Sequence, residues 1–260
     1  MSKRIDLVPI TVALVLATSP AWSDQNNGAT QPGNANCKGL PTASQLREFL
    51  NAAPGTGGTV GGLFDGTRMW AAVVNRDGEI CAYATGGSPA AAADSRSVWP
   101  ASQAIAKAKA FTANSLNVDD VPPLSTARLY TLVQPGHSLY GVNHSNPFDP
   151  KYNIPPSGNG PSRGQIAAGL ITFGGGVALY SGSRVMGGLG VSGDTACADH
   201  EIAKRVRMLA GMDPPGGALV DDIKYSAADG PSIFSHPACI NTWRNGVKIP
   251  DDETAHLPPY

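Results

Sequence analysis

The 260-residue sequence lacks an apolar run long enough to cross a membrane. Its longest such run extends from Leu7 to Ala17, with Pro9 and Thr11 inside it, whereas a transmembrane helix needs roughly 20 apolar residues. An excess of one charge is also missing, because 19 basic residues face 20 acidic ones. This balance argues against nucleic acid or an anionic membrane as the main partner. The sequence therefore predicts a soluble protein with another kind of ligand.

Motifs that would indicate an enzyme are missing as well. Ser192 is not in a nucleophile elbow, because Asp194 stands in place of the last glycine. The segment Phe173-Gly174-Gly175-Gly176 is not a phosphate loop, since no Lys-Ser/Thr pair follows it. Gly188 to Gly193 has the spacing of a dinucleotide fingerprint, but no βαβ unit surrounds it and no acid ends a strand about 20 residues later. These absences favour a binding protein over an enzyme.

The two glycine-rich segments instead predict local backbone structure. Glycines at 188–193 would let a strand pack closely and turn sharply into a helix, with Asp194 or Thr195 as its N-cap. Three glycines after Phe173 predict a bulge or a close backbone approach to a ligand.

Cysteine is scarce, with Cys37, Cys81, Cys197 and Cys239 as the whole set. No Cys-x-x-Cys-His motif is present, which excludes covalent c-type haem, and no pair has zinc-knuckle spacing. An even number in an exported chain indicates disulfides, for which three pairings are possible. We favour Cys37–Cys81 and Cys197–Cys239, because each would fasten a terminal extension to a regular element. Each closes a loop of about 45 residues, for a stabilisation of roughly 4 kcal/mol.

The N-terminus has the parts of a secretory signal peptide. Lys3 and Arg4 precede the apolar run, and Ala21 and Ser23 occupy the −3 and −1 positions of a cut before Asp24. We therefore expect residues 1–23 to be removed and the protein to be periplasmic or secreted. The remaining chain is long enough for one domain with a substantial core.

Residue patterns predict one α+β domain with a mainly antiparallel sheet. A flexible leader over 24–40 precedes a domain over 41–211, and a C-terminal extension over 212–260 packs on it. The first expected helix has Thr42 or Ser44 as its cap and ends at about Asn51, and two more cover 95–116 and 197–209. Asp77-Gly78 joins a hairpin of strands over 69–75 and 79–85. Two more strands are expected over 167–180 and 184–192. In the last helix, Lys204, Arg205 and Arg207 are expected to face mostly outward.

An irregular insert at about 121–166 separates the two halves of this domain. It is rich in Pro, Gly, Asn and Ser around a predicted strand at 128–133, and long loops of this kind are usually functional or mobile.

Histidine supplies the candidate metal ligands. His200 lies one turn after Cys197, and His236 lies three residues before Cys239. If that disulfide forms, both rings are held near it and could share a metal or a haem iron. His137 and His144 in the insert are alternative axial ligands, and an ordinary helix-surface position is the alternative for His200.

Several segments occur in an order that resembles the GlcG/HbpS-like haem-binding family. They are Trp70–Asn75 with Asp77-Gly78, Ala108–Ala113, Phe173–Val177, Gly187–Gly193, and Gly193–Ala203 as in an exported branch of the family. The resemblance implies a profilin-like fold, in which helices flank a central antiparallel sheet, and assembly into a homo-oligomer. It also implies binding of haem or another tetrapyrrole, with no catalytic reaction common to the family.

For this chain the resemblance implies haem held non-covalently between the sheet and the helix that carries Lys109. We expect His200 as the first choice of axial ligand and His236 as the second, with Lys109 near the propionates and Phe111 and Phe173 as walls. Storage, sensing or delivery of haem would be the function. The alternative is an accessory or enzymatic component of a small organic acid or aldehyde oxidation pathway that works without haem.

Overall fold

A four-stranded antiparallel sheet organises the chain in the computed structural model, which describes residues 36–93, 97–145, 166 and 168–250. The strands are β1 (Met69–Asn75), β2 (Ile80–Gly86), β3 (Gly176–Ser181) and β4 (Arg184–Ser192), in the order β2-β1-β4-β3. The expected hairpin is confirmed, with Gly78 at a φ of 81° in its turn. The predicted signal peptide and residues 24–35 of the leader lie outside the described residues.

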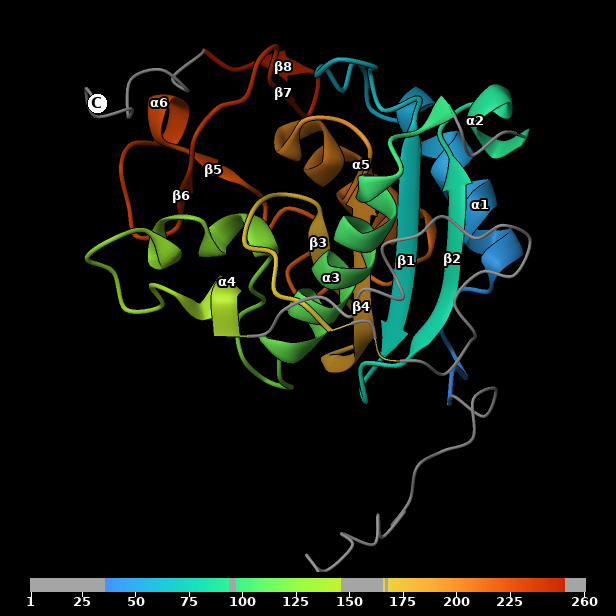
Figure 1. Cartoon of the computed structure of the whole chain (residues 1–260), viewed down its shortest axis with the longest axis horizontal. Helices are drawn as coiled ribbons and strands as arrows, with labels where there is room; N and C mark the ends of the chain where they lie inside the picture. Colours follow the sequence, from blue (N-terminus) through green and yellow to red (C-terminus); the bar gives the residue numbers. More distant parts are fainter. Residues whose placement is uncertain (1–35, 94–96, 146–165, 167, 251–260) are drawn as a thin grey trace, which may run out of the picture.

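Helices cover both faces of this sheet (Figure 1), as the α+β prediction required. Because side chains alternate along a strand, Met69, Ala71 and Val73 of β1 pack toward α1 (Ala43–Ala52) and α5 (Ala196–Leu209). Trp70, Ala72 and Val74 pack on the other side with Ala106 and Ala110 of α3 (Ala101–Ser115). Every residue of β1 is therefore buried.

The N-terminal ends of α1 and α5 are capped by the residues that the sequence suggested. Thr42 forms a capping box with Gln45 at the start of α1. Thr195 is the N-cap of α5, and its side chain accepts a hydrogen bond from the Ala198 N–H. The helix expected from residue 95 begins instead at Ala101, because the ring of Pro100 carries no N–H to continue a helix.

Glycines in β4 allow α3 to lie directly on the sheet. A Cβ atom on Gly188 would come within 2.1 Å of the Ala110 carbonyl oxygen, and one on Gly190 within 2.0 Å of the Ala106 carbonyl oxygen. The alternate residues Leu189 and Val191 point to the opposite face and join the core with α5. The close packing predicted for this segment is thus confirmed, and it leaves no room for a ligand between β4 and α3.

Two strand predictions in and after the insert were wrong. Residues 128–133 form parts of two short 3-10 helices, η3 (Thr126–Leu129) and η4 (Thr131–Val133), followed by the short helix α4 (Val142–Ser145). The Tyr180 N–H at the edge of the sheet bonds to the Met212 carbonyl, so 128–133 adds no strand there. The strand expected from residue 167 begins only at Gly176, since Ala168, Gly169 and Gly175 have positive φ values.

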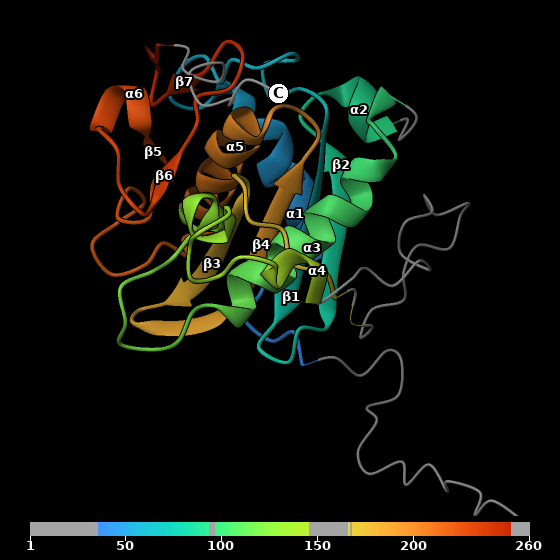
Figure 2. The same cartoon turned by 60° about the vertical axis from the view of Figure 1, so that its left-hand side comes forward.

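The prediction that the basic residues of α5 face outward was also wrong. Lys204, Arg205 and Arg207 are all buried. The C-terminal segment lies along α5 (Figure 2) and supplies acidic partners for two of them, Asp222 for Lys204 and Asp221 for Arg207. The C-terminal segment contains β5 (Lys224–Tyr225), α6 (Ser226–Asp229), β6 (Ser235–His236), β7 (Trp243–Arg244) and β8 (Val247–Lys248). Two further short helices, η1 (Ala53–Gly55) and α2 (Pro89–Ala93), lie in the N-terminal half of the chain. Among the described helices, none is long and apolar enough to cross a membrane.

Candidate functional site

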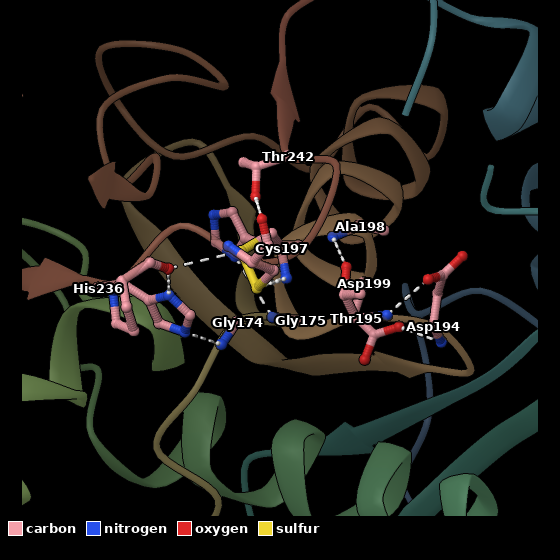
Figure 3. Close-up of a disulfide and its surroundings, with 12 residues drawn as sticks. Gly174, Gly175, Asp194, Thr195, Cys197, Ala198, Asp199, His236 and Thr242 are labelled. Atoms are coloured by element: carbon pink, nitrogen blue, oxygen red, sulfur yellow. Dashed lines mark hydrogen bonds between the residues drawn. A yellow bond between two sulfur atoms is a disulfide. The ribbon is translucent and has the colours of Figure 1, made fainter. Parts of the chain in front are cut away.

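The glycine segment after Phe173, the N-terminus of α5 and the C-terminal segment meet at one place (Figure 3). Both favoured disulfides are present, Cys37–Cys81 and Cys197–Cys239. The second one joins α5 to the C-terminal segment and stands at the centre of this region. Several residues that the sequence singled out separately are therefore neighbours in space.

His236 is buried at 2% exposure and is oriented by two hydrogen bonds. Its Nδ1 lies 2.7 Å from the carbonyl oxygen of Pro237, which can only accept a hydrogen bond, so Nδ1 carries the proton. The Gly174 N–H in turn donates to Nε2 at 3.3 Å. The aromatic ring of Tyr130 lies 4.9 Å from the imidazole, centre to centre. The ring is thus a neutral imidazole fixed in one tautomer.

His200 lies on α5 and is fully buried. The Gly175 N–H donates to its Nδ1 at 3.4 Å, while Nε2 makes no hydrogen bond to the described residues and lies 3.7 Å from Asp222. Burial, followed by the charge of Lys204, holds the pKa of His200 well below its usual range. This ring is therefore neutral too, and it is enclosed by protein.

Lys109 is paired within the protein rather than available to a ligand. Its Nζ donates to Asp199 at 2.6 Å and to the Val191 carbonyl at 3.0 Å, beneath the N-terminus of α5. Asp199 also accepts the N–H groups of Gly193 and Asp194. Burial lowers the pKa of Lys109 and raises that of Asp199 to about 6, and the attraction between the two opposes both effects.

The two aromatic candidates lie in different places. Phe173 is half-buried, with its ring centre 4.9 Å from the Lys109 Nζ. Phe111 lies at the far end of α3, where a Cβ atom on Gly78 of the hairpin turn would come within 2.8 Å of its ring. The structure therefore brings together His200, His236, Lys109 and Phe173 but not Phe111. The loop candidates His137 and His144 are both exposed.

A surface pocket of about 350 Å³ opens beside His236. Its lining comes from the insert, the glycine segment, the start of α5 and the C-terminal segment: Tyr130, Phe173, Thr195, Ala196, His236, Pro237, Cys239 and Ile240. His200 does not line it. Sequence reasoning missed Tyr130 and Ile240, and no local pattern marks them, because only the folded C-terminal segment places them at one opening.

A second cavity, of about 230 Å³, lies on the other side of α5. Its lining includes Glu201, Lys204, Arg205 and Asn245. The Lys204 Nζ lies 2.7 Å from Glu201 and 2.6 Å from Asp222, so its charge is already neutralised. Arg205 donates to three backbone carbonyls as well as lying near Glu201. Among the described residues that line it, the cavity thus offers no unpaired cation to an acidic ligand.

Comparison with known proteins identifies the class to which this arrangement belongs. The pattern of the family described as "Haem degrading protein HbpS-like" matches residues 65–207, more than half of the chain. The protein therefore belongs to the HbpS-like family, and the resemblance seen in the sequence is confirmed. The matched range contains Lys109, Phe173, Cys197 and His200, whereas His236 lies beyond it.

Several solved structures are similar to this chain at low sequence identity. A Klebsiella pneumoniae protein, ORFY, is 22% identical over 65% of this chain and 87% of its own, with a TM-score of 0.43. A complex of PduOC with haem is also 22% identical, over 64% and 89%, with a TM-score of 0.43. HbpS itself is 20% identical over 65% and 89%, with a TM-score of 0.40. Among curated proteins, none matches the chain.

Proposed function

We propose that this protein binds haem non-covalently in the pocket beside His236. The observation that carries the proposal is the imidazole itself, which is neutral and lines an opening together with two aromatic side chains. Membership of a family described by its action on haem supports the same ligand. Storage, sensing or delivery of haem is the role that we infer.

The described lining residues suit one face of the haem ring, but they do not suit its charged propionates. His236 would bind iron through Nε2 in exchange for the hydrogen bond from the Gly174 N–H, while Nδ1–H keeps its bond to the Pro237 carbonyl, as the second ring N–H of a metal-binding histidine usually does. Tyr130 and Phe173 provide aromatic walls. No basic side chain occurs among the described lining residues, so the propionates would remain in solvent. Haem would supply a redox-active iron, and these residues would hold and shield it.

His236 replaces His200 as our first choice of axial ligand. His200 is enclosed by protein and does not line the pocket, so iron could reach it only if this region opened. The small-acid alternative has less support, because the cations in the second cavity are already paired.

Haem titration followed by the Soret band tests the proposal. We expect the wild-type protein to shift the Soret band with one haem per chain, and His236→Ala to abolish or displace that band. His144→Ala is the matched control, because His144 is exposed on a short helix and should leave the spectrum unchanged. If wild-type protein binds no haem at micromolar concentration, the proposal fails. If His144→Ala alters the spectrum, haem binds at the insert and not beside His236.

We also propose that the protein is exported. Two disulfides are typical of an oxidising compartment, and the N-terminal pattern is that of a signal peptide. A mature N-terminus at Asp24, found by sequencing the secreted protein, is the expected result. Retention of residues 1–23 would contradict it.

A further inference from the structure

Three side chains that bind metals converge where the C-terminal segment meets α5. The ligand atoms of Cys197, His236 and Cys239 all lie within 4.8 Å of one another. The two sulfurs form a disulfide in this structure, and in that form they are poor ligands, because a metal needs thiolates. Figure 3 shows His236 beside this bond.

Backbone N–H groups point at both sulfurs. The Cys197 N–H lies 3.3 Å from the Cys239 Sγ, and the Cys239 N–H lies 3.2 Å from the Cys197 Sγ. Cys197 is also the second residue of α5, where the helix dipole favours negative charge. If the bond between the sulfurs were broken, this environment would stabilise thiolates.

The cysteines would stay close together without their covalent bond. Their neighbours form a hydrophobic cluster that includes Ile223, Tyr225 and Ile249. The Thr242 hydroxyl donates to the Cys239 carbonyl at 2.6 Å, and the Gly62 N–H donates to the Asn241 carbonyl at 2.9 Å. The first bond fixes the turn at Cys239 and the second joins the segment to the loop before β1. Contact with α5 itself comes from the Lys204–Asp222 ion pair at 2.6 Å and from the Asn245 N–H, which donates to Glu201 at 3.2 Å, and neither depends on the disulfide.

We propose that reduction of the Cys197–Cys239 disulfide creates a Cys₂His site for Zn²⁺ with His236 as the third ligand. A dithiol donor gives two electrons and two protons to the disulfide and becomes a disulfide itself. Zn²⁺ then displaces the two thiol protons and binds both sulfurs and one imidazole nitrogen, which exchanges its present hydrogen bond to Gly174 or Pro237 for the metal. Three protein ligands leave the fourth tetrahedral position to water from the pocket that His236 and Cys239 line.

This site would make metal binding dependent on the redox state. The oxidised protein has one imidazole at this place and binds Zn²⁺ weakly, whereas the reduced protein has all three ligands. The inference does not rest on haem binding. Both ligands would use His236, so Zn²⁺ in the reduced protein should exclude haem from that residue.

Titration of the full chain with Co²⁺ tests the inference. The protein is reduced with a phosphine, the phosphine is removed without oxygen, and Co²⁺ is added. We expect one Co²⁺ per chain with tetrahedral d–d bands and a thiolate-to-cobalt charge-transfer band, both displaced by Zn²⁺. The oxidised protein should show neither band. Cys37→Ser/Cys81→Ser should keep them, and Cys197→Ser/Cys239→Ser should lose them.

A histidine comparison shows whether the imidazole takes part. His236→Ala should weaken Co²⁺ binding by at least about tenfold, while the exposed control His144→Ala leaves it unchanged. Because a variant may fold poorly, a second measurement uses the wild-type protein: Zn²⁺ should protect two of its four thiols from alkylation. Absence of the charge-transfer band, or alkylation of all four thiols at equal rates with Zn²⁺ present, would overturn the inference.

Discussion

Two buried histidines flank the glycine segment, and each is held neutral by its own surroundings. The N–H groups of Gly174 and Gly175 donate to His236 and His200, respectively. An imidazole that accepts a backbone N–H cannot carry a proton on the accepting nitrogen. At the scale of single residues, the backbone of this segment therefore orients both rings, while burial, followed by the charge of Lys204, lowers the pKa of His200.

His200 should lower the free energy of unfolding as pH falls below about 6.5. Its pKa in the folded protein is well below the reference value, chiefly through burial and next through the charge of Lys204. Below about pH 6.5 the unfolded chain binds a proton at this position that the folded chain does not, so acid favours unfolding by up to about 1.4 kcal/mol per pH unit. Above that pH the contribution of His200 is fully retained.

The substitution His200→Asn isolates this effect, because its amide oxygen can still accept the Gly175 N–H. Urea unfolding at about pH 7.5 and about pH 5.5 should show the stability gap between variant and wild type narrowing in acid. Asp199, with its pKa raised to about 6, makes acid stabilise the fold. It does so equally in the variant and the wild type, so its contribution cancels when their unfolding free energies are subtracted. His144→Asn should give a constant gap. A constant gap for His200→Asn as well would mean that His200 binds its proton equally well in the folded and the unfolded chain, which would contradict the lowered pKa.

At the scale of elements, the contact of α3 with β4 depends on the missing side chains of two glycines. Backbone atoms of α3 lie only about 2 Å from the positions that Cβ atoms on Gly188 and Gly190 would take. Backbone cannot move aside as the end of a flexible side chain can. The same close contact excludes the haem position first expected between the sheet and the Lys109 helix.

Gly190→Ala should destabilise the protein by about 3 kcal/mol or more, the upper end of what overpacking usually does. The added Cβ atom would meet the Ala106 carbonyl oxygen at 2.0 Å and the Ala110 nitrogen at 2.4 Å. Gly55→Ala is the matched control, because its Cβ atom would meet nothing within 4 Å, and we expect a change within about 0.5 kcal/mol. Thermal unfolding measures both, and equal losses would refute this account of the packing.

Elements with a strong local pattern were predicted well, and those that depend on distant partners were not. Thr42, the Asp77-Gly78 turn and Thr195 mark their elements by chemistry that acts within a few residues. Residues 128–133 have an apolar composition suited to a strand, yet they pair with none of the described strands. Strand pairing is a property of the folded sheet, so local composition could not decide it.

At the scale of the whole molecule, the C-terminal segment completes the environment of α5. Arg207 is fully buried and makes two hydrogen bonds to Asp221, at 2.6 and 2.8 Å. It also donates to the Ala218 carbonyl at 3.1 Å. These bonds join a helix within the family match to a segment beyond it. The homo-oligomer implied by the family resemblance stays a prediction.

Arg207→Met should cost about 3–5 kcal/mol in unfolding free energy, because it leaves the buried Asp221 carboxylate without its partner. Adding Asp221→Leu should recover part of that loss, since the unpaired charge is then removed. The partly exposed pair Arg244–Asp229 provides the comparison, and Arg244→Met should cost no more than about 1 kcal/mol. Urea unfolding gives all three values. If Arg207→Met cost as little as Arg244→Met, the buried pair would not hold the segment.

The sequence by itself determined the family, the α+β class, the hairpin and the caps, because these depend on side-chain periodicity and on contacts within a few residues. It also indicated both disulfides, although three pairings were open until the cysteines were placed. Only the tertiary structure decided that the basic residues of α5 are buried, that Lys109 is paired with Asp199, and that His236 rather than His200 lines the pocket. Each of these depends on which distant segment covers a helix face, and burial and pairing with a distant partner leave no periodic trace in the sequence.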